Sequence, residues 1–142
     1  MRSLVIYVFL LVASTTCGYN ACAQKPKISN KSFEGVWQVS MQKSPAGSDK
    51  FLPPHNNDFK IFDADGNFRH IFYLNNKYVE LSNGKIEITS DSTYTEHLNR
   101  HIAVPSSIKE GKIIFHFLDE NTFLMKWELG KSNGQEIYER VR

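Results

Sequence analysis

The chain has 142 residues, of which 17 are Lys or Arg and 15 are Asp or Glu, giving a formal net charge of +2. Because these charges nearly balance and form no block of one sign, the sequence shows no electrostatic footprint for nucleic acid or an anionic membrane. The length suits one domain with a single core, and no internal repeat or low-complexity run divides it.

The first 23 residues are typical of a secretory signal peptide. Arg2 supplies a positive start, an apolar run extends from Leu4 to Ala13, and Ala21-Cys22-Ala23 forms a small-x-small cleavage site. The run of about ten residues is roughly half the length that spans a bilayer, which argues against a membrane anchor. We therefore expect an exported protein, periplasmic or secreted, whose mature domain comprises residues 24–142 and has no membrane span.

Both cysteines, Cys17 and Cys22, precede the expected cleavage site. The mature domain would then hold no thiol, and therefore no disulfide, no thiolate metal site and no cysteine nucleophile. A lipid-anchored envelope protein is the alternative, but Ser14 and Tyr19 stand where lipoprotein signals have an aliphatic residue.

Alternation of apolar and polar residues marks the strands of the mature domain. In the first strand, which we place at Phe33 to Met41, one face carries Phe33, Gly35, Trp37, Val39 and Met41. Phenylalanine, isoleucine and tyrosine dominate the later strands, as half-buried strands prefer. These strands are expected at Asp58–Asp63, Asn67–Leu74, Lys85–Thr89, Thr93–Leu98, Lys112–Leu118, Thr122–Leu129 and Gln135–Arg142.

The connections alternate between tight turns and longer links. Tight hairpin turns are indicated at Asp63-Ala64-Asp65-Gly66, Ser90-Asp91 and Asp119-Glu120-Asn121. The longer links are residues 42–57, 75–84, 99–111 and 130–134. An alternative for the second link is an extra small hairpin around Tyr78 to Leu81, closed by Asn83-Gly84. No segment shows a convincing helical period. We predict an all-β fold, a single up-and-down antiparallel eight-stranded barrel with tight turns at one end and long loops at the other.

The number of strands decides whether the two ends of the domain meet. With an even count the last strand ends at the rim where the first begins, which would bring Arg140 to Trp37. A guanidinium over an indole contributes about 0.5–2 kcal/mol, depending on desolvation, and the contact would fasten the two edge strands together. We expect Gly35, Trp37 and Arg140 to close the barrel; the alternative is a plain core tryptophan and a solvated arginine.

Several short motifs, in this order, resemble the lipocalin-like (calycin) barrels. The motifs are Gly35-Val36-Trp37, Phe59-Lys60-Ile61-Phe62 with Asp65-Gly66, Tyr94-Thr95-Glu96, and Tyr138-Glu139-Arg140-Val141. They look like one branch, the exported bacterial (Bacteroidetes-type) lipocalin-like domains of unknown function. The resemblance covers essentially the whole mature chain, and it implies a barrel and an extracytoplasmic location but brings no catalytic residue.

Polar residues on inward strand faces are the candidates for a ligand site. If Phe68 and Phe72 face the core then so does His70, and if Tyr94 and Leu98 do then so does Glu96. Burying such groups unpaired is costly, so they would need each other, water or a ligand. The ligand-binding hypothesis comprises Met41, His70, Tyr94, Glu96 and Trp127.

In this hypothesis Glu96 orients the polar end of an otherwise apolar ligand, and Met41, Tyr94 and Trp127 supply contact area. The alternatives are an internal salt-bridged or hydrated pair without a ligand, and simple core packing for Trp127. The residue types of Glu96, His97 and His101 suit zinc, but two histidines at i and i+4 face one ion only on a helix. We expect no metal, no cofactor and no catalytic activity, because no serine–histidine–acid set or phosphate-binding glycine loop is present.

Two functions remain open from the sequence. The first is an exported binding module for a small, largely apolar or amphipathic ligand, because an eight-stranded barrel holds either side chains or one small ligand. The second is a protein-binding envelope accessory or inhibitor with a filled barrel. It would use mouth loops 42–57 and 99–111, which are restricted by Pro45, Pro53, Pro54 and Pro105.

Overall fold

The computed structural model describes residues 27–43 and 49–142, so the expected signal peptide, residues 1–23, lies outside the described residues. One short helix, α1 (Asn30–Phe33), precedes eight strands. The strands are β1 (Gly35–Lys43), β2 (Asp58–Phe62), β3 (Asn67–Leu74), β4 (Lys77–Ser90), β5 (Thr93–His101), β6 (Glu110–Asp119), β7 (Thr122–Leu129) and β8 (Ser132–Arg140).

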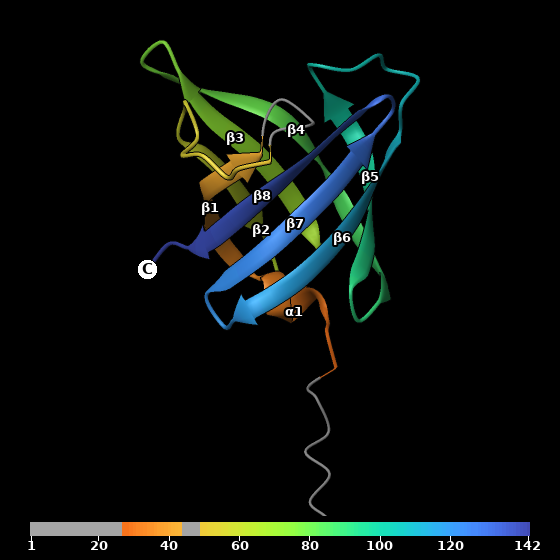
Figure 1. Ribbon diagram of the computed structural model, residues 1–142. Helices are drawn as coiled ribbons and strands as arrows, with labels where there is room; N and C mark the ends of the chain where they lie inside the picture. The colour runs from red at the N-terminus through yellow and green to blue at the C-terminus, as the bar shows by residue number, and fades with distance from the viewer. Residues whose placement is uncertain (1–26, 44–48) are drawn as a thin grey trace, which may run out of the picture.

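Each strand pairs with its neighbours in the sequence, and β1 also pairs with β8, so the sheet closes into a barrel (Figure 1). All pairings are antiparallel and the strand order is up-and-down, which confirms the predicted fold class. Because β1 and β8 pair with each other, neither the first nor the last strand of the described sheet is an open edge. No helix of the described segments is long and apolar enough to cross a membrane.

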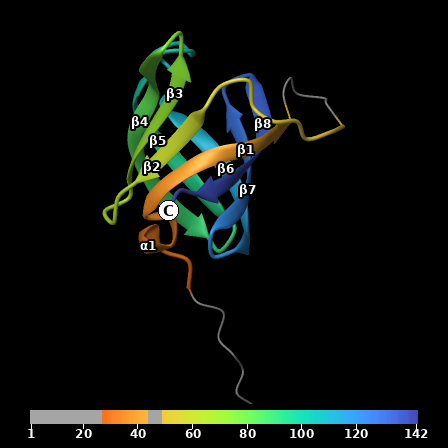
Figure 2. The same cartoon turned by 90° about the vertical axis from the view of Figure 1, so that its left-hand side faces the viewer.

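The two ends of the barrel differ, as Figures 1 and 2 show. The β2–β3, β4–β5 and β6–β7 turns lie beside α1 at what we call the closed end. The β3–β4, β5–β6 and β7–β8 connections, and the described part of the β1–β2 connection, lie at the opposite end, the mouth. The sequence therefore predicted correctly which connections share an end.

Two of the links expected to be long are tight turns. Asn75 and Asn76 alone join β3 to β4, and their φ angles of 50° and 60° match the type I′ turn that suits a hairpin. The proposed extra hairpin is absent because Asn83 and Gly84 pair with β3 and β5, so β4 runs on through Tyr78 to Leu81. The β7–β8 link is likewise only residues 130–131.

A β-bulge in β1 changes which face its last residues present. Trp37 and Val39 point inward and are buried, but the register then shifts, and Met41 pairs with Ile137 of β8. Residues directly opposite each other share a face of the sheet, and Ile137 faces outward because its neighbour Tyr138 is a core residue. Met41 therefore lies on the outer wall, and its expected inward position is wrong.

The closed end is filled by aromatic side chains. Phe33 was expected to begin the first strand, but it ends α1 instead and is fully buried. The helix was missed because four residues show no period, although Ser29 and Ser32 form a capping box around it. The ring of Phe33 lies 4.9–5.7 Å, centroid to centroid, from five other aromatic rings: Phe62, Tyr94, Phe115, Phe117 and Phe123.

Arg140 joins the last strand to the first strand and to α1. The carbon atom at the centre of its guanidinium lies 4.1 Å from the centroid of the Trp37 ring. The guanidinium donates to the backbone carbonyls of Glu34 and Ser32, and the Trp37 indole N–H donates to the carbonyl of Phe33 at 2.7 Å. One cluster therefore closes the barrel seam and holds the helix against the closed end.

Gly35 belongs to the same cluster and has no room for a side chain. Its φ angle is +129°, and a Cβ atom built there would lie 2.7 Å from a guanidinium nitrogen of Arg140. Only glycine combines this backbone conformation with so close an approach of the arginine.

Candidate functional site

The mouth half of the barrel contains a cavity of about 240 Å³. Ile113 and Met125 belong both to the hydrophobic core and to the cavity wall, so the cavity begins where the core ends. Charged, polar and apolar side chains from opposite sides of the barrel meet around it, among them Lys60, His70, Glu96, Trp127, Leu129 and Glu136.

A buried ion pair crosses the floor of this cavity. Lys60 of β2 and Glu96 of β5 are 2% and 7% exposed, and the lysine ammonium donates a hydrogen bond to the glutamate carboxylate. The Tyr94 hydroxyl donates to the same carboxylate oxygen at 3.4 Å, and the ammonium also lies 5.3 Å from the centroid of the Phe68 ring. Attraction at this depth offsets the desolvation of both charges only because each has these further partners.

Glu96 faces the interior, where its alternation with Tyr94 and Leu98 had placed it, but its cationic partner is Lys60 and not His70. The sequence analysis did not select Lys60. The signal was available, because Lys60 alternates with Phe62 on an inward face of a strand whose pattern was recognised.

His70 also faces the cavity and has its own carboxylate. Its Nε2 atom lies 2.5 Å from Oδ1 of Asp58, and both side chains are partly buried. Ser82 pairs with His70 on one side and His101 on the other, so the two histidines lie along one row of the wall. Burial, and then the nearby His70, lower the pKa of His101, which favours its neutral form.

Glu136 is the third inward carboxylate and was not selected from the sequence. The Trp127 indole N–H donates to one of its oxygens at 3.0 Å, and the Tyr138 hydroxyl donates to the other at 2.8 Å. Burial raises the pKa of Glu136. Trp127 reaches this position because Gly134 lies opposite; a Cβ atom on Gly134 would be 2.6 Å from the indole ring.

Four of the five predicted ligand-binding residues come together. His70, Glu96 and Trp127 line the cavity, and Tyr94 adjoins it through its hydrogen bond to Glu96. Met41 does not contribute, because the bulge in β1 turns it to the outer wall.

His97 and His101 do not lie on the same side of the barrel wall. His97 points to the outer wall, where its ring nitrogens lie 2.8 Å from Glu87 and 3.3 Å from Glu110. His101, four residues after His97 in the sequence, lines the cavity instead. Among the described residues, no group of three or more His, Cys, Asp or Glu side chains is placed to hold a metal ion.

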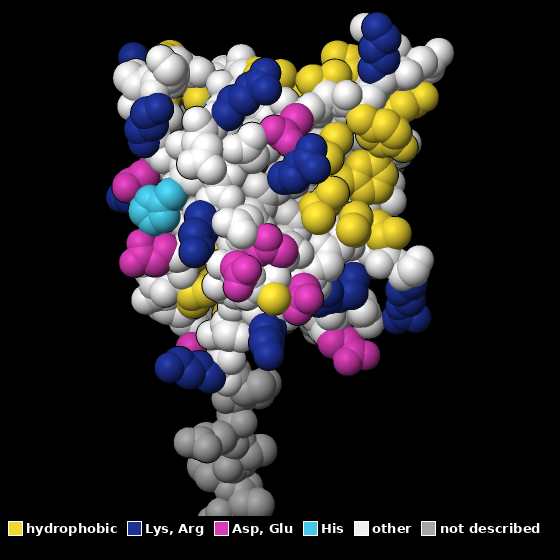
Figure 3. Space-filling view, turned by 180° about the vertical axis from the view of Figure 1, so that it is seen from behind, with side chains coloured by type: hydrophobic (Ala, Val, Ile, Leu, Met, Phe, Trp, Pro, Cys, Tyr) yellow, Lys and Arg dark blue, Asp and Glu magenta, His cyan; other side chains and the backbone are white. Residues whose placement is uncertain are grey.

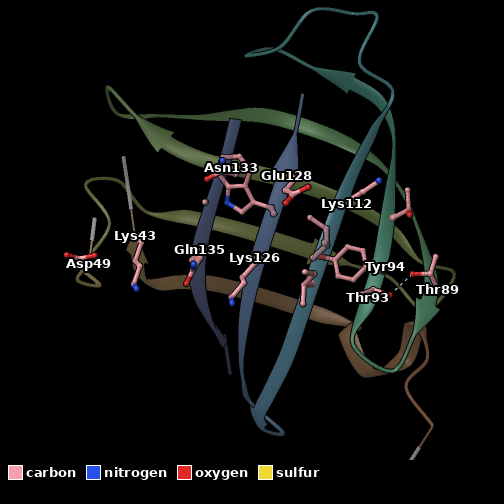
Figure 4. Close-up of a pocket in the computed structure, with 15 residues that line it drawn as sticks. Lys43, Asp49, Thr89, Thr93, Tyr94, Lys112, Lys126, Glu128, Asn133 and Gln135 are labelled. Atoms are coloured by element: carbon pink, nitrogen blue, oxygen red, sulfur yellow. Dashed lines mark hydrogen bonds between the residues drawn. The ribbon is translucent and has the colours of Figure 1, made fainter. Parts of the chain in front are cut away.

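A larger groove of about 690 Å³ lies on the outer wall, over β5 to β8 (Figure 4). Lys43, Gln135 and Lys126 form a row across β1, β8 and β7, and Lys112 and Glu128 face each other on the neighbouring row. Lys112, Lys126 and Glu128 are exposed, so water already satisfies their charges. The smaller cavity is the better candidate site, because its charges are withdrawn from water.

The part of the chain that forms the cavity matches one known protein family. Residues 32–142 match the model of a family described as "Domain of unknown function (DUF4488)". No curated protein matches the chain. The matched segment extends from α1 to the last residue of the chain and contains every residue named above as lining the cavity.

Proposed function

We propose a role for the chain from its own cavity, since it belongs to the DUF4488 family, whose members are described only as domains of unknown function. The role is that of a binding module that holds one small amphipathic ligand in the mouth half of the barrel. The observation that carries this proposal is the cavity itself, about 240 Å³ between buried ionic groups and apolar walls. Pockets for drug-sized ligands measure roughly 300–1,000 Å³, so this ligand would be smaller.

The lining supports an amphipathic ligand better than a largely apolar one. Lys60, Glu96 and Glu136 present charged groups, whereas Trp127 and Leu129 present apolar surface. A ligand would direct its polar end toward the charged groups and pack its remainder against the indole. Glu96 is not the sole anchor in this arrangement, because Lys60 already neutralises it.

Gly111 offers a direct test of cavity binding. A Cβ atom at Gly111 would make ordinary contacts of 3.6 Å with Leu129 and 3.9 Å with Glu96, and φ does not lie in the left-handed region. Gly111→Leu should therefore fill the cavity without backbone strain. Lys112→Leu is the matched control, since it adds the same side chain to the exposed outer face of the same strand.

Native mass spectrometry of protein purified without denaturant would measure any retained small molecule, and ligand-observed NMR with a fragment library would measure binding capacity. We expect the unmodified chain and Lys112→Leu to bind and Gly111→Leu to lose binding. Equal binding by unmodified chain and Gly111→Leu would show that the cavity is not the site.

We also propose that the protein is exported. The support is the charged start at Arg2, the apolar run and the Ala21-Cys22-Ala23 cleavage site. Intact mass of the protein from its native cells should correspond to a chain beginning at Gln24. A mass carrying a diacylated or triacylated cysteine would instead establish a lipid-anchored envelope protein.

A second candidate function, protein binding, is favoured by an exposed apolar surface beside the mouth. Figure 3 shows hydrophobic side chains gathered below the β3–β4 hairpin. In this hairpin, Tyr78 is 72% exposed and packs against Tyr73 of the adjacent strand, with ring centroids 4.9 Å apart. If this surface is an interface, the unmodified chain should pull down a stoichiometric protein partner from envelope extracts. Tyr78→Ser should lose that partner, whereas Gly111→Leu should still bind it.

A further inference from the structure

The inward carboxylates of the cavity are not all neutralised. Asp58 has His70 and Glu96 has Lys60, but Glu136 forms no ion pair with any residue of the described segments. Two carboxylates are thus matched by cationic or protonatable partners, and one is matched only by neutral donors. When Glu136 is ionised, no cationic side chain of the described segments forms an ion pair with it.

The two donors hold Glu136 in place without saturating it. Trp127 serves one carboxylate oxygen and Tyr138 serves the other. An ionised carboxylate accepts roughly four hydrogen bonds, so each oxygen retains a free acceptor position. Because the group lines the cavity, those free positions are available to whatever enters it.

The surroundings of Glu136 suit a cation with a short apolar body. The indole of Trp127 borders the cavity, and a cation over an indole face is attracted by the ring quadrupole. Leu129 and Val104 add apolar wall near the mouth. A divalent metal ion fits less well, because the described residues provide no group of three or more metal-binding side chains.

We propose that the ligand is a small organic ammonium ion, whose N–H groups bind Glu136 and whose apolar body packs against Trp127 and Leu129. This inference rests on the proposed binding function and adds the chemical class of the ligand. The ammonium ion acts as the cationic partner that Glu136 does not have among the described residues. The apolar body of the ligand replaces water along the apolar wall. The limited volume restricts the body to about the size of one ring.

Three probes of similar shape separate charge from size: 2-phenylethylamine, which is cationic at pH 7.5, neutral 2-phenylethanol and anionic phenylacetate. Isothermal titration calorimetry on the purified protein measures each affinity, and NMR chemical-shift changes at Trp127 show whether the cavity is occupied. We expect the amine to bind at least tenfold more tightly than the alcohol, and phenylacetate to bind more weakly than either.

Glu136→Gln removes the charge with little change of shape, and Glu139→Gln is the matched control on the exposed side of the same strand. The first variant should bind amine and alcohol alike, and the second should keep the tenfold preference. Retention of the preference in Glu136→Gln would overturn the assignment of this carboxylate.

The comparison of probes on the unmodified chain is decisive even if Glu136→Gln fails to fold. Equal affinities for amine and alcohol would overturn the cationic ligand but leave a cavity that binds small molecules. If none of the three probes binds, the proposal of an ammonium ligand is also wrong. The proposed binding function is tested separately, and it fails if Gly111→Leu retains as much ligand as the unmodified chain.

Discussion

Lys60 and Glu96, 36 residues apart in the sequence, form an ion pair across the barrel interior, with side chains that are only 3% and 9% exposed. The pair joins β2 to β5, two strands that are not neighbours in the sheet. It separates the aromatic core of the closed end from the cavity at the mouth. A buried charge inside a small barrel lowers the stability of the fold unless its partner of opposite charge is also present.

Removing one partner of this pair should therefore destabilise the protein strongly. Lys60→Met leaves Glu96 buried with only the weak Tyr94 hydrogen bond, and we expect a loss of about 3–5 kcal/mol in the free energy of unfolding. Lys60→Met combined with Glu96→Leu should recover much of this loss, because no uncompensated charge remains.

Urea unfolding followed by tryptophan fluorescence measures both values. Lys126→Met on the exposed outer wall is the control, expected within about 0.5 kcal/mol of the unmodified chain. If Lys60→Met is as stable as this control, the ion pair between Lys60 and Glu96 does not contribute to stability.

The contact between Trp37 and Arg140 predicts energetic coupling. Trp37→Ala should cost about 3–5 kcal/mol, because it leaves a cavity among aromatic side chains. Arg140→Met should cost less, because the aliphatic stem still packs on the ring. The double variant should deviate from the sum of the single variants by about 0.5 kcal/mol or more, and simple additivity would show that the guanidinium stack has no energetic role.

Gly35 and Gly111 should respond in opposite ways to alanine. Gly35→Ala forces a side chain into positive φ and against Arg140, so a loss of more than about 1 kcal/mol is expected. Gly111→Ala meets only ordinary contacts and should be neutral or stabilising by about 0.4–1 kcal/mol. Thermal unfolding of the two variants in parallel tests this contrast, and similar melting temperatures would contradict it.

Alternation and turn chemistry in the sequence predicted the eight strands and the closed barrel, because both are local properties, but β4 begins at Lys77 and not at the expected Lys85. Alternation placed Asn67–Leu74 and Thr122–Leu129 without error. It failed at Met41, where one inserted residue reverses the face of everything that follows and leaves no mark in the hydrophobic pattern.

The sequence pattern did not predict which polar side chains pair inside the cavity. Alternation indicates that Glu96 points inward, but not that it meets Lys60, because contacts across the interior depend on strand tilt and stagger. His70 was a plausible partner by the same reasoning and in the structure belongs to Asp58. A sequence pattern therefore predicts which residues face a barrel interior, and the pairing among them requires coordinates.

Glu136 should make the stability of the protein depend on pH. Burial raises its pKa above 4.5, the ordinary value for a glutamate, so between that value and the raised pKa the folded chain binds more protons than the unfolded chain. Stability therefore falls as pH rises through this interval, and the cost is complete above the raised pKa. Asp58, Lys60 and His70 also act electrostatically on Glu136.

Those groups are present in both the unmodified chain and Glu136→Gln, so the difference in unfolding free energy between the two isolates Glu136. The glutamine can still accept a hydrogen bond from Trp127 and buries no charge, so the variant should gain stability relative to the unmodified chain as pH rises.

Urea unfolding at pH values from about 4 to 8 measures the difference in unfolding free energy between the variant and the unmodified chain. Glu139→Gln, on the exposed face of β8, should show a flat difference. A flat difference for Glu136→Gln as well, or a gain that shrinks as pH rises, would show that the carboxyl group of Glu136 is solvated and carries no unmatched buried charge.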